Sequence, residues 1–168
     1  KIYTSMKTKS LIILIFTTII VSCSNNIDKP EKLGNEVILL LKKSNTISDK
    51  EYFSEFISLN ELNSFWKKTV INEKDREQIS SITQDMWKQK IINDFIKIKE
   101  KGLKYNIDWE NIELIDFIYE IKEKNEVKGL NGKLIFTSND MKYKIQTTFI
   151  QIDDEYKLYE IKDLRKDY

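Results

Sequence analysis

The stretch KLIFTSNDMKYKIQTTFIQIDDEYKLYEIKDL, residues 133–164, decides the fold of this chain. Apolar and polar residues alternate along it, and it is rich in Ile, Phe, Tyr and Thr, which favour strands. Two polar segments, Ser138-Asn139-Asp140 and Asp153-Asp154, interrupt the alternation and are typical of tight turns. The stretch therefore predicts strands over residues 133–138, 141–152 and 156–164.

A further strand is expected before this stretch. Residues 112–122 alternate in the same way, and the segment Gly129-Leu130-Asn131-Gly132 indicates a turn between this strand and residues 133–138. Connections this short favour antiparallel hairpins. We therefore expect a four-stranded antiparallel meander.

The residues upstream of the strands have helical periodicity. Pro30 suits the first turn of a helix that extends to about Lys43. Two S-x-x-E capping boxes begin at Ser48 and Ser58 and predict two short helices. Helices followed by strands indicate an α+β domain, which we place over residues 30–168.

The longest helix is expected over residues 73–101, with Gly102 as its C-terminal cap. Apolar residues recur at helical spacing along one side of it, and charged residues occupy the other. The apolar residues are Ile79, Ile82, Met86, Ile91, Phe95 and Ile98. This side would suit core packing, and a membrane-surface or partner-binding helix is the alternative.

The start of the chain has the pattern of an export signal. Lys7 and Lys9 precede an apolar run over residues 11–21, which is too short to span a hydrocarbon layer of about 30 Å but matches a signal-peptide core. A buried core helix or a transmembrane anchor would also be apolar. Thr17 and Thr18 within the run favour a signal peptide over both alternatives.

Ile20-Val21-Ser22-Cys23 resembles the lipobox of bacterial lipoproteins. The resemblance implies cleavage between Ser22 and Cys23, diacylglycerol on the Cys23 sulfur and usually a further acyl chain on the new amino group. Two or more acyl chains anchor a protein stably to membrane lipid. Residues 1–22 would then be removed and residues 23–29 would form a lipidated tether; the alternative is a chance free cysteine. The residue after the cysteine is Ser24. By resemblance to the sorting rule of enterobacterial lipoproteins, a serine at this position implies the outer membrane rather than the inner membrane.

Composition excludes several kinds of chemistry. The chain has 28 Lys plus Arg and 27 Asp plus Glu, but residues 1–22 hold three of the lysines, so residues 23–168 have a net charge of −2. No basic surplus indicates nucleic acid as a partner. The absence of histidine excludes Ser-His and Cys-His catalysis and removes the commonest zinc ligand. We predict no cofactor and no metal.

The order of elements from Pro30 to Leu164 resembles the nuclear transport factor 2-like superfamily, also called cystatin-like. Its last strand is similar to residues 153–161, where an acidic turn leads into an aromatic-Lys-aliphatic run. The resemblance implies a cone-like fold in which the sheet curves around a helix. The helix over residues 73–101 fits the superfamily if it breaks near Asp85 or Asn93.

Members of the superfamily include isomerases and binding modules, so the fold alone does not choose a function. An isomerase needs a carboxylate base in an apolar pocket. Asp116 is the candidate base, on one strand face with Ile112, Leu114 and Ile118, and Tyr143 would supply a phenol from another strand. The alternative places Asp116 on an open face, where it pairs with a lysine such as Lys142 or Lys144.

Two other clusters favour structural roles. Asp153-Asp154-Glu155 lacks the alternate ligand spacing of a calcium loop and suits a solvated turn. Trp66, Trp87 and Trp109 would either line a ligand pocket or pack in the core. The helical spacing of Trp66 and Trp87 favours core packing.

The leading hypothesis is a lipid-anchored, non-catalytic binding or interaction module of the cell envelope, facing the periplasm or the exterior. Its partner would be another envelope protein, including a toxin if the chain is an immunity lipoprotein. The alternative is a small-molecule pocket protein or a cofactor-free isomerase-like enzyme that uses Asp116.

Overall fold

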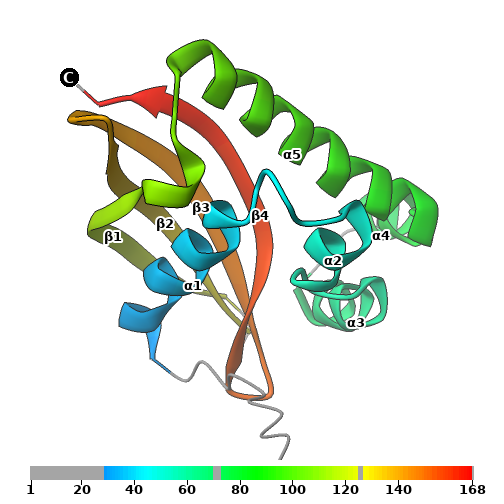
Figure 1. Cartoon of the computed structure of the whole chain (residues 1–168). Helices are drawn as coiled ribbons and strands as arrows, with labels where there is room; N and C mark the ends of the chain where they lie inside the picture. Colours follow the sequence, from blue (N-terminus) through cyan, green and yellow to red (C-terminus); the bar gives the residue numbers. More distant parts are fainter. Residues whose placement is uncertain (1–28, 70–72, 125–126, 168) are drawn as a thin grey trace, which may run out of the picture.

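A computed structural model of the chain describes residues 29–69, 73–124 and 127–167. Helices come first and strands follow, which confirms the α+β order (Figure 1). The elements are α1 (Pro30–Lys42), α2 (Asp49–Ser54), α3 (Leu59–Thr69), α4 (Glu73–Ser80), α5 (Gln84–Tyr105), the 3-10 turn η1 (Trp109–Asn111), β1 (Glu113–Lys124), β2 (Val127–Ser138), β3 (Met141–Ile152) and β4 (Glu155–Lys166). The predicted signal peptide and nearly all of the tether lie outside the described residues.

The strands form one antiparallel sheet in the order β1-β2-β3-β4, so the predicted meander is confirmed. Asn139 and Asp140 have φ of 50° and 61°, and Asp153 and Asp154 have φ of 47° and 67°. Two consecutive residues with positive φ are the mark of a type I′ hairpin turn, whose twist matches that of the strands. Asn and Asp tolerate this conformation, which explains why these pairs indicated the turns correctly.

The turn expected at Gly129-Leu130-Asn131-Gly132 is wrong, because all four residues pair inside β2. Gly132 has a different role. A Cβ atom placed on it would lie 2.3 Å from the Cε2 atom of Phe117. The ring of Phe117 therefore requires glycine at this position in the strand.

The two capping boxes are confirmed. The carboxylate of Glu51 accepts a hydrogen bond of 3.0 Å from the backbone N–H of Ser48, and Glu61 accepts one of 3.0 Å from Ser58. In each pair the serine hydroxyl also accepts the backbone N–H of the glutamate, at 3.3 Å. These bonds satisfy N–H groups that the first turn of a helix leaves without partners.

The continuous helix expected over residues 73–101 is wrong, but the break lies close to Asp85, one of the two positions that the superfamily resemblance required. The end of the helix also differs from the expected one. The chain breaks between α4 and α5, where Thr83 caps α5 by accepting the N–H of Met86 at 3.2 Å. α5 ends at Tyr105, and Asn106, with a φ of 55°, provides the left-handed cap. Gly102 instead makes room for Trp109, because a Cβ atom on it would lie 2.5 Å from the indole.

The side chains at the start of α5 also differ from the expected apolar side. Met86 is 55% exposed, whereas Trp87 is 2% exposed and donates its indole N–H to the carbonyl of Ile57 at 3.0 Å. Further along the helix, Ile91, Phe95 and Ile98 are buried as expected. The break before α5 resets the helical phase, which explains the difference.

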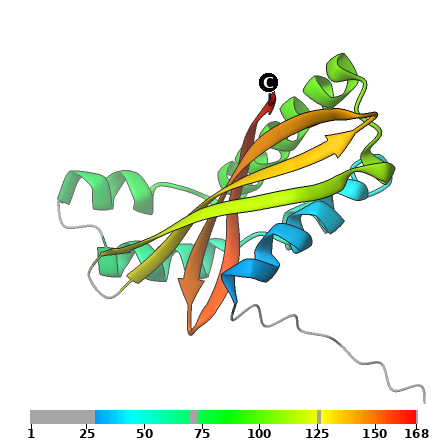
Figure 2. The same ribbon diagram turned by 90° about the vertical axis from the view of Figure 1, so that its left-hand side faces the viewer.

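The helices cover one face of the curved sheet. In Figure 1, α1 crosses in front of the strands and α5 runs beside β4; Figure 2 shows α5 behind the strands. Leu134 and Ile145 point to the helices and have no exposed surface, whereas their neighbours Lys133 and Gln146 are exposed on the other face. The expected cone-like arrangement is thus present. Among the described helices, none has the length and apolar character to cross a membrane.

The link between α2 and α3 is attached directly to the sheet. Phe56 forms a parallel bridge with Leu158 of β4, and the N–H of Ile57 donates to the carbonyl of Leu158 at 2.8 Å. Nearby, Tyr52 stacks on Phe95 of α5 with ring centroids 3.7 Å apart. These contacts fix the link opposite α1.

Candidate functional site

Asp116 lies on the uncovered face of the sheet, where its side chain is exposed. We expected it on one strand face with Ile112, Leu114 and Ile118. A bulge at Ile115 shifts the register of β1 by one residue, and such a shift reverses the faces that follow. Asp116 therefore shares its face with Ile118 but not with Ile112 and Leu114.

Tyr143 lies on the opposite face of the sheet and is 2% exposed. Its hydroxyl donates to the carbonyl of Tyr105 at 3.1 Å, and its ring stacks on Phe136. Tyr143 and Asp116 are thus separated by the sheet and do not form a common site. Within the described residues, Asp116 has no ion pair with Lys142 or Lys144.

The other predicted site residues either belong to a turn or to the core, or lie outside the described residues. Ser22 and Cys23 lie outside the described residues. Asp153 and Asp154 form the β3–β4 turn, and Trp109 is buried in the core. In the part of the chain that the structure describes, no three His, Cys, Asp or Glu side chains come together as metal ligands.

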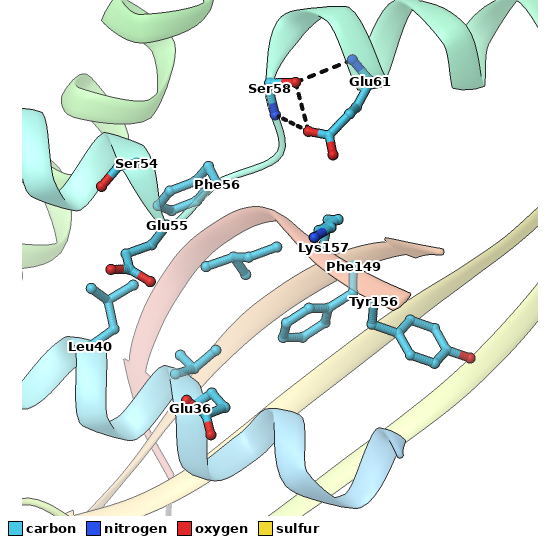
Figure 3. Close-up of a pocket in the computed structure, with 12 residues that line it drawn as sticks. Glu36, Leu40, Ser54, Glu55, Phe56, Ser58, Glu61, Phe149, Tyr156 and Lys157 are labelled. Carbon is cyan, nitrogen blue, oxygen red and sulfur yellow. Dashed lines mark hydrogen bonds between the residues drawn. The ribbon is translucent and has the colours of Figure 1, made fainter. Parts of the chain in front are cut away.

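A cleft of about 450 Å³ is the candidate binding site (Figure 3). It lies between α1, the link from α2 to α3, and strands β3 and β4. Its volume falls within the range of roughly 300–1,000 Å³ that is usual for ligand sites. The three segments are far apart in the sequence and meet only in the fold.

The floor of the cleft is apolar. Its side chains come from all three segments, and each is at most 8% exposed. They are Val37, Leu40, Phe56, Phe149, Tyr156 and Leu158. Phe149 and Leu158 are paired across β3 and β4, and the bridge from Leu158 to Phe56 brings the link onto the same surface.

The rim of the cleft is polar and mainly acidic. Glu36 lies on the α1 side, and Glu55 and Glu61 lie on the opposite side (Figure 3). Among the described residues that line the cleft, Lys157 is the one basic side chain, and its Nζ atom lies 2.8 Å from Oε2 of Glu155. Lys157 is therefore paired with Glu155, and its charge also helps to lower the pKa of Glu61.

The capping box fixes the charge of Glu61. A hydrogen bond of 2.6 Å from the Ser58 hydroxyl lowers the pKa of Glu61, and this effect outweighs the burial that would raise it. Burial raises the pKa of Tyr156 on the floor. At neutral pH the rim thus carries an ionised carboxylate at Glu61, whereas the hydroxyl of Tyr156 points away from the cleft (Figure 3).

The uncovered face of the sheet has a hollow of about 500 Å³, but its lining is mainly polar and includes Lys133, Gln146 and Lys162. Ile115, Ile118 and Ile121 of β1 are 46–48% exposed. The register puts Ile118 on this face and Ile121 on the helix side, so these isoleucines do not form one patch. We therefore place the candidate site in the cleft.

Sequence reasoning missed this cleft. The capping box of Ser58 and Glu61 was visible as a local signal, but it indicated only a helix start. Glu36 and Glu55 had no signal in their spacing, because the fold alone brings α1 and the link after α2 to the same cleft. The bridge from Phe56 to Leu158 places Glu55 beside β4.

Comparison with known proteins supports the fold. No protein-family model and no curated protein matches the chain. Among solved structures, the chain is similar to a cystatin-like protein from Ruminococcus gnavus, with a TM-score of 0.51 and 11% sequence identity. The similarity covers 82% of this chain and 45% of that protein, so the chain spans less than half of its length. This likeness confirms the expected cystatin-like α+β fold.

Proposed function

We propose that the protein is a membrane-anchored bacterial lipoprotein whose domain acts as a non-catalytic binding module of the cell envelope. The cleft carries the proposal. It joins an apolar floor to a charged rim, and this combination suits the binding of a ligand or of a partner's side chain. The partner would be another envelope protein, or a toxin if the chain confers immunity.

The proposed anchor rests on the lipobox-like segment that ends at Cys23. Residues 24–29 separate this cysteine from the start of α1 and would extend at most about 20 Å. Because α1 also forms one wall of the cleft, the site would lie close to the membrane.

The isomerase-like alternative has weaker support. It requires Asp116 in an apolar pocket, but Asp116 is exposed and is not part of the cleft. We therefore favour binding without catalysis.

Photo-crosslinking in the native envelope tests the proposal. A photoreactive side chain at Glu36 would face the cleft, whereas one at Leu39, which is 54% exposed on the same helix and does not line the cleft, provides the matched control. We expect a discrete crosslinked product from position 36 and none from position 39. Ser54→Trp should abolish the product, because Ser54 lines the cleft and the larger side chain would fill it.

Equal products from positions 36 and 39 would argue against the cleft as the binding site. The same conclusion would follow if the product survived Ser54→Trp in a variant that folds normally by circular dichroism.

A further inference from the structure

The charged side chains at the rim of the cleft are mainly acidic. Three rim carboxylates come from different segments: Glu36 from α1, Glu55 from the end of α2 and Glu61 from α3. Lys157 is compensated by Glu155, so the rim has an excess of negative charge. A cleft with one sign of charge and low-dielectric walls concentrates the opposite charge.

The positions of the carboxylates strengthen this preference. Glu36 and Glu61 are half-buried, and Glu61 is held in its ionised form by Ser58. An anionic ligand here would meet repulsion in a partly desolvated site, whereas a cation would find charge-assisted acceptors. Only one oxygen of Glu61 takes part in the capping box, and its other oxygen has no partner among the described residues.

The floor adds a requirement for an apolar stem. Phe56, Phe149 and Leu158 lie beneath the rim and are at most 8% exposed. Lysine and arginine side chains bury their methylene stems against such surfaces while the charged end stays at the rim. A simple inorganic cation would leave this apolar floor without contact.

We propose that the cleft binds a basic side chain, lysine or arginine, presented by the protein partner; this inference rests on the proposed function and names the chemistry of its site. The aliphatic stem packs on Phe56 and Leu158, and the charged end contacts Glu55 and Glu61. The rim excludes acidic groups.

Three small probes with a similar stem and different charge test the inference: butylguanidinium, 1-pentanol and pentanoate. Each is titrated into the full-length protein in detergent while the backbone amide resonances of Val37, Phe56 and Lys157 are followed by NMR. We expect saturable shifts with butylguanidinium, weaker shifts with pentanol and none with pentanoate. Raising the salt concentration should weaken the binding of butylguanidinium.

Charge-neutral variants locate the effect. Glu55→Gln and Glu61→Gln should each weaken butylguanidinium binding about fivefold, the effect of roughly 1 kcal/mol for a partly exposed ion pair. Glutamine can replace glutamate in a capping box, so Glu61→Gln should keep α3 intact. Glu100→Gln is the matched control, because Glu100 is exposed on α5 and does not line the cleft.

The outcomes separate this inference from the proposed function. If pentanol binds in the cleft as tightly as butylguanidinium, or if the glutamine variants bind butylguanidinium normally, the preference for a basic group is wrong while the binding module stands. If no probe shifts the cleft resonances and position 36 gives no crosslink, both proposals are wrong.

Discussion

Phe117 shows how single residues set the distance between α1 and the sheet. Its ring lies against two glycines: a Cβ atom on Gly34 of α1 would be 2.7 Å from the Cβ of Phe117, and one on Gly132 would be 2.3 Å from its ring. The ring also meets Phe149 edge-on, with centroids 6.4 Å apart. Since Phe149 is on the floor of the cleft, this packing supports the candidate site.

Gly132→Ala should destabilise the protein by about 1–3 kcal/mol, because the added methyl group would displace the ring of Phe117. Gly129→Ala is the control in the same strand, since the nearest atom to its Cβ would be 3.6 Å away, an ordinary contact. Urea denaturation measures both. Equal midpoints for the two variants would contradict the packing argument.

At the scale of elements, α5 is held to β4 by an aromatic and ionic cluster. Trp87 stacks on Tyr159 with centroids 5.4 Å apart. The Nζ atom of Lys90 lies 2.7 Å from Glu160 and 3.0 Å from Asp94. Burial alone would raise the pKa of Glu160, but hydrogen bonds from Lys162 and Lys90 outweigh it and lower that pKa.

This cluster predicts a dependence of stability on pH. Because the pKa of Glu160 is lower in the folded chain than its ordinary value of 4.5, its contribution is present above pH 4.5 and is lost as the pH falls through the folded pKa. Glu160→Gln should reduce stability by about 1 kcal/mol at pH 7 and have a smaller effect at pH 3.

Urea denaturation at both pH values measures this difference, with Glu77→Gln as the control, because Glu77 is exposed on α4. A deficit in Glu160→Gln that is the same at pH 7 and pH 3 would show that the ion pairs do not cause it.

At the scale of the whole molecule, only residues 24–29 separate the proposed anchor at Cys23 from α1, the helix that forms one wall of the cleft. The proposed lipid is attached at Cys23, and α1, which begins at Pro30, forms a wall of the cleft. The module would therefore present its site near the membrane surface, where envelope partners diffuse in two dimensions.

Cys23→Ser should abolish metabolic labelling by palmitate and leave the precursor uncleaved, because the sulfur that would accept diacylglycerol is gone. Ser24→Ala, at the neighbouring position, should keep both labelling and cleavage. Gel mobility and radiolabel incorporation in whole cells measure the two effects. Normal processing of Cys23→Ser would mean that the start of the chain is not a lipoprotein signal.

Most elements of the fold were predictable because their signals are local. The Asn139-Asp140 and Asp153-Asp154 pairs marked their turns, and Ser48 and Ser58 marked two helix starts. The glycines led to two wrong predictions. Gly102 suggested a helix cap, and Gly129 with Gly132 suggested a turn. Gly102 and Gly132 are instead required by the rings of Trp109 and Phe117, which approach from other segments.

The candidate site was far less predictable. Asp116 was assigned to a face by counting along the strand, and the bulge at Ile115 reversed that face. Bulges depend on how two strands pair, and the alternation of a single strand does not reveal them. Glu36, Glu55 and Lys157 had no reason to be grouped, since they are distant in the sequence.

The sequence by itself determined the strand alternation, the hairpin turns at Asn139-Asp140 and Asp153-Asp154, and the capping boxes, because each depends on the conformational preferences of residues within a few positions. Only the tertiary structure decided the face of Asp116 and the cleft. The cleft exists because the bridge from Phe56 to Leu158 fixes the α2–α3 link across from α1. Contacts of this kind join segments whose separation along the chain carries no local signal.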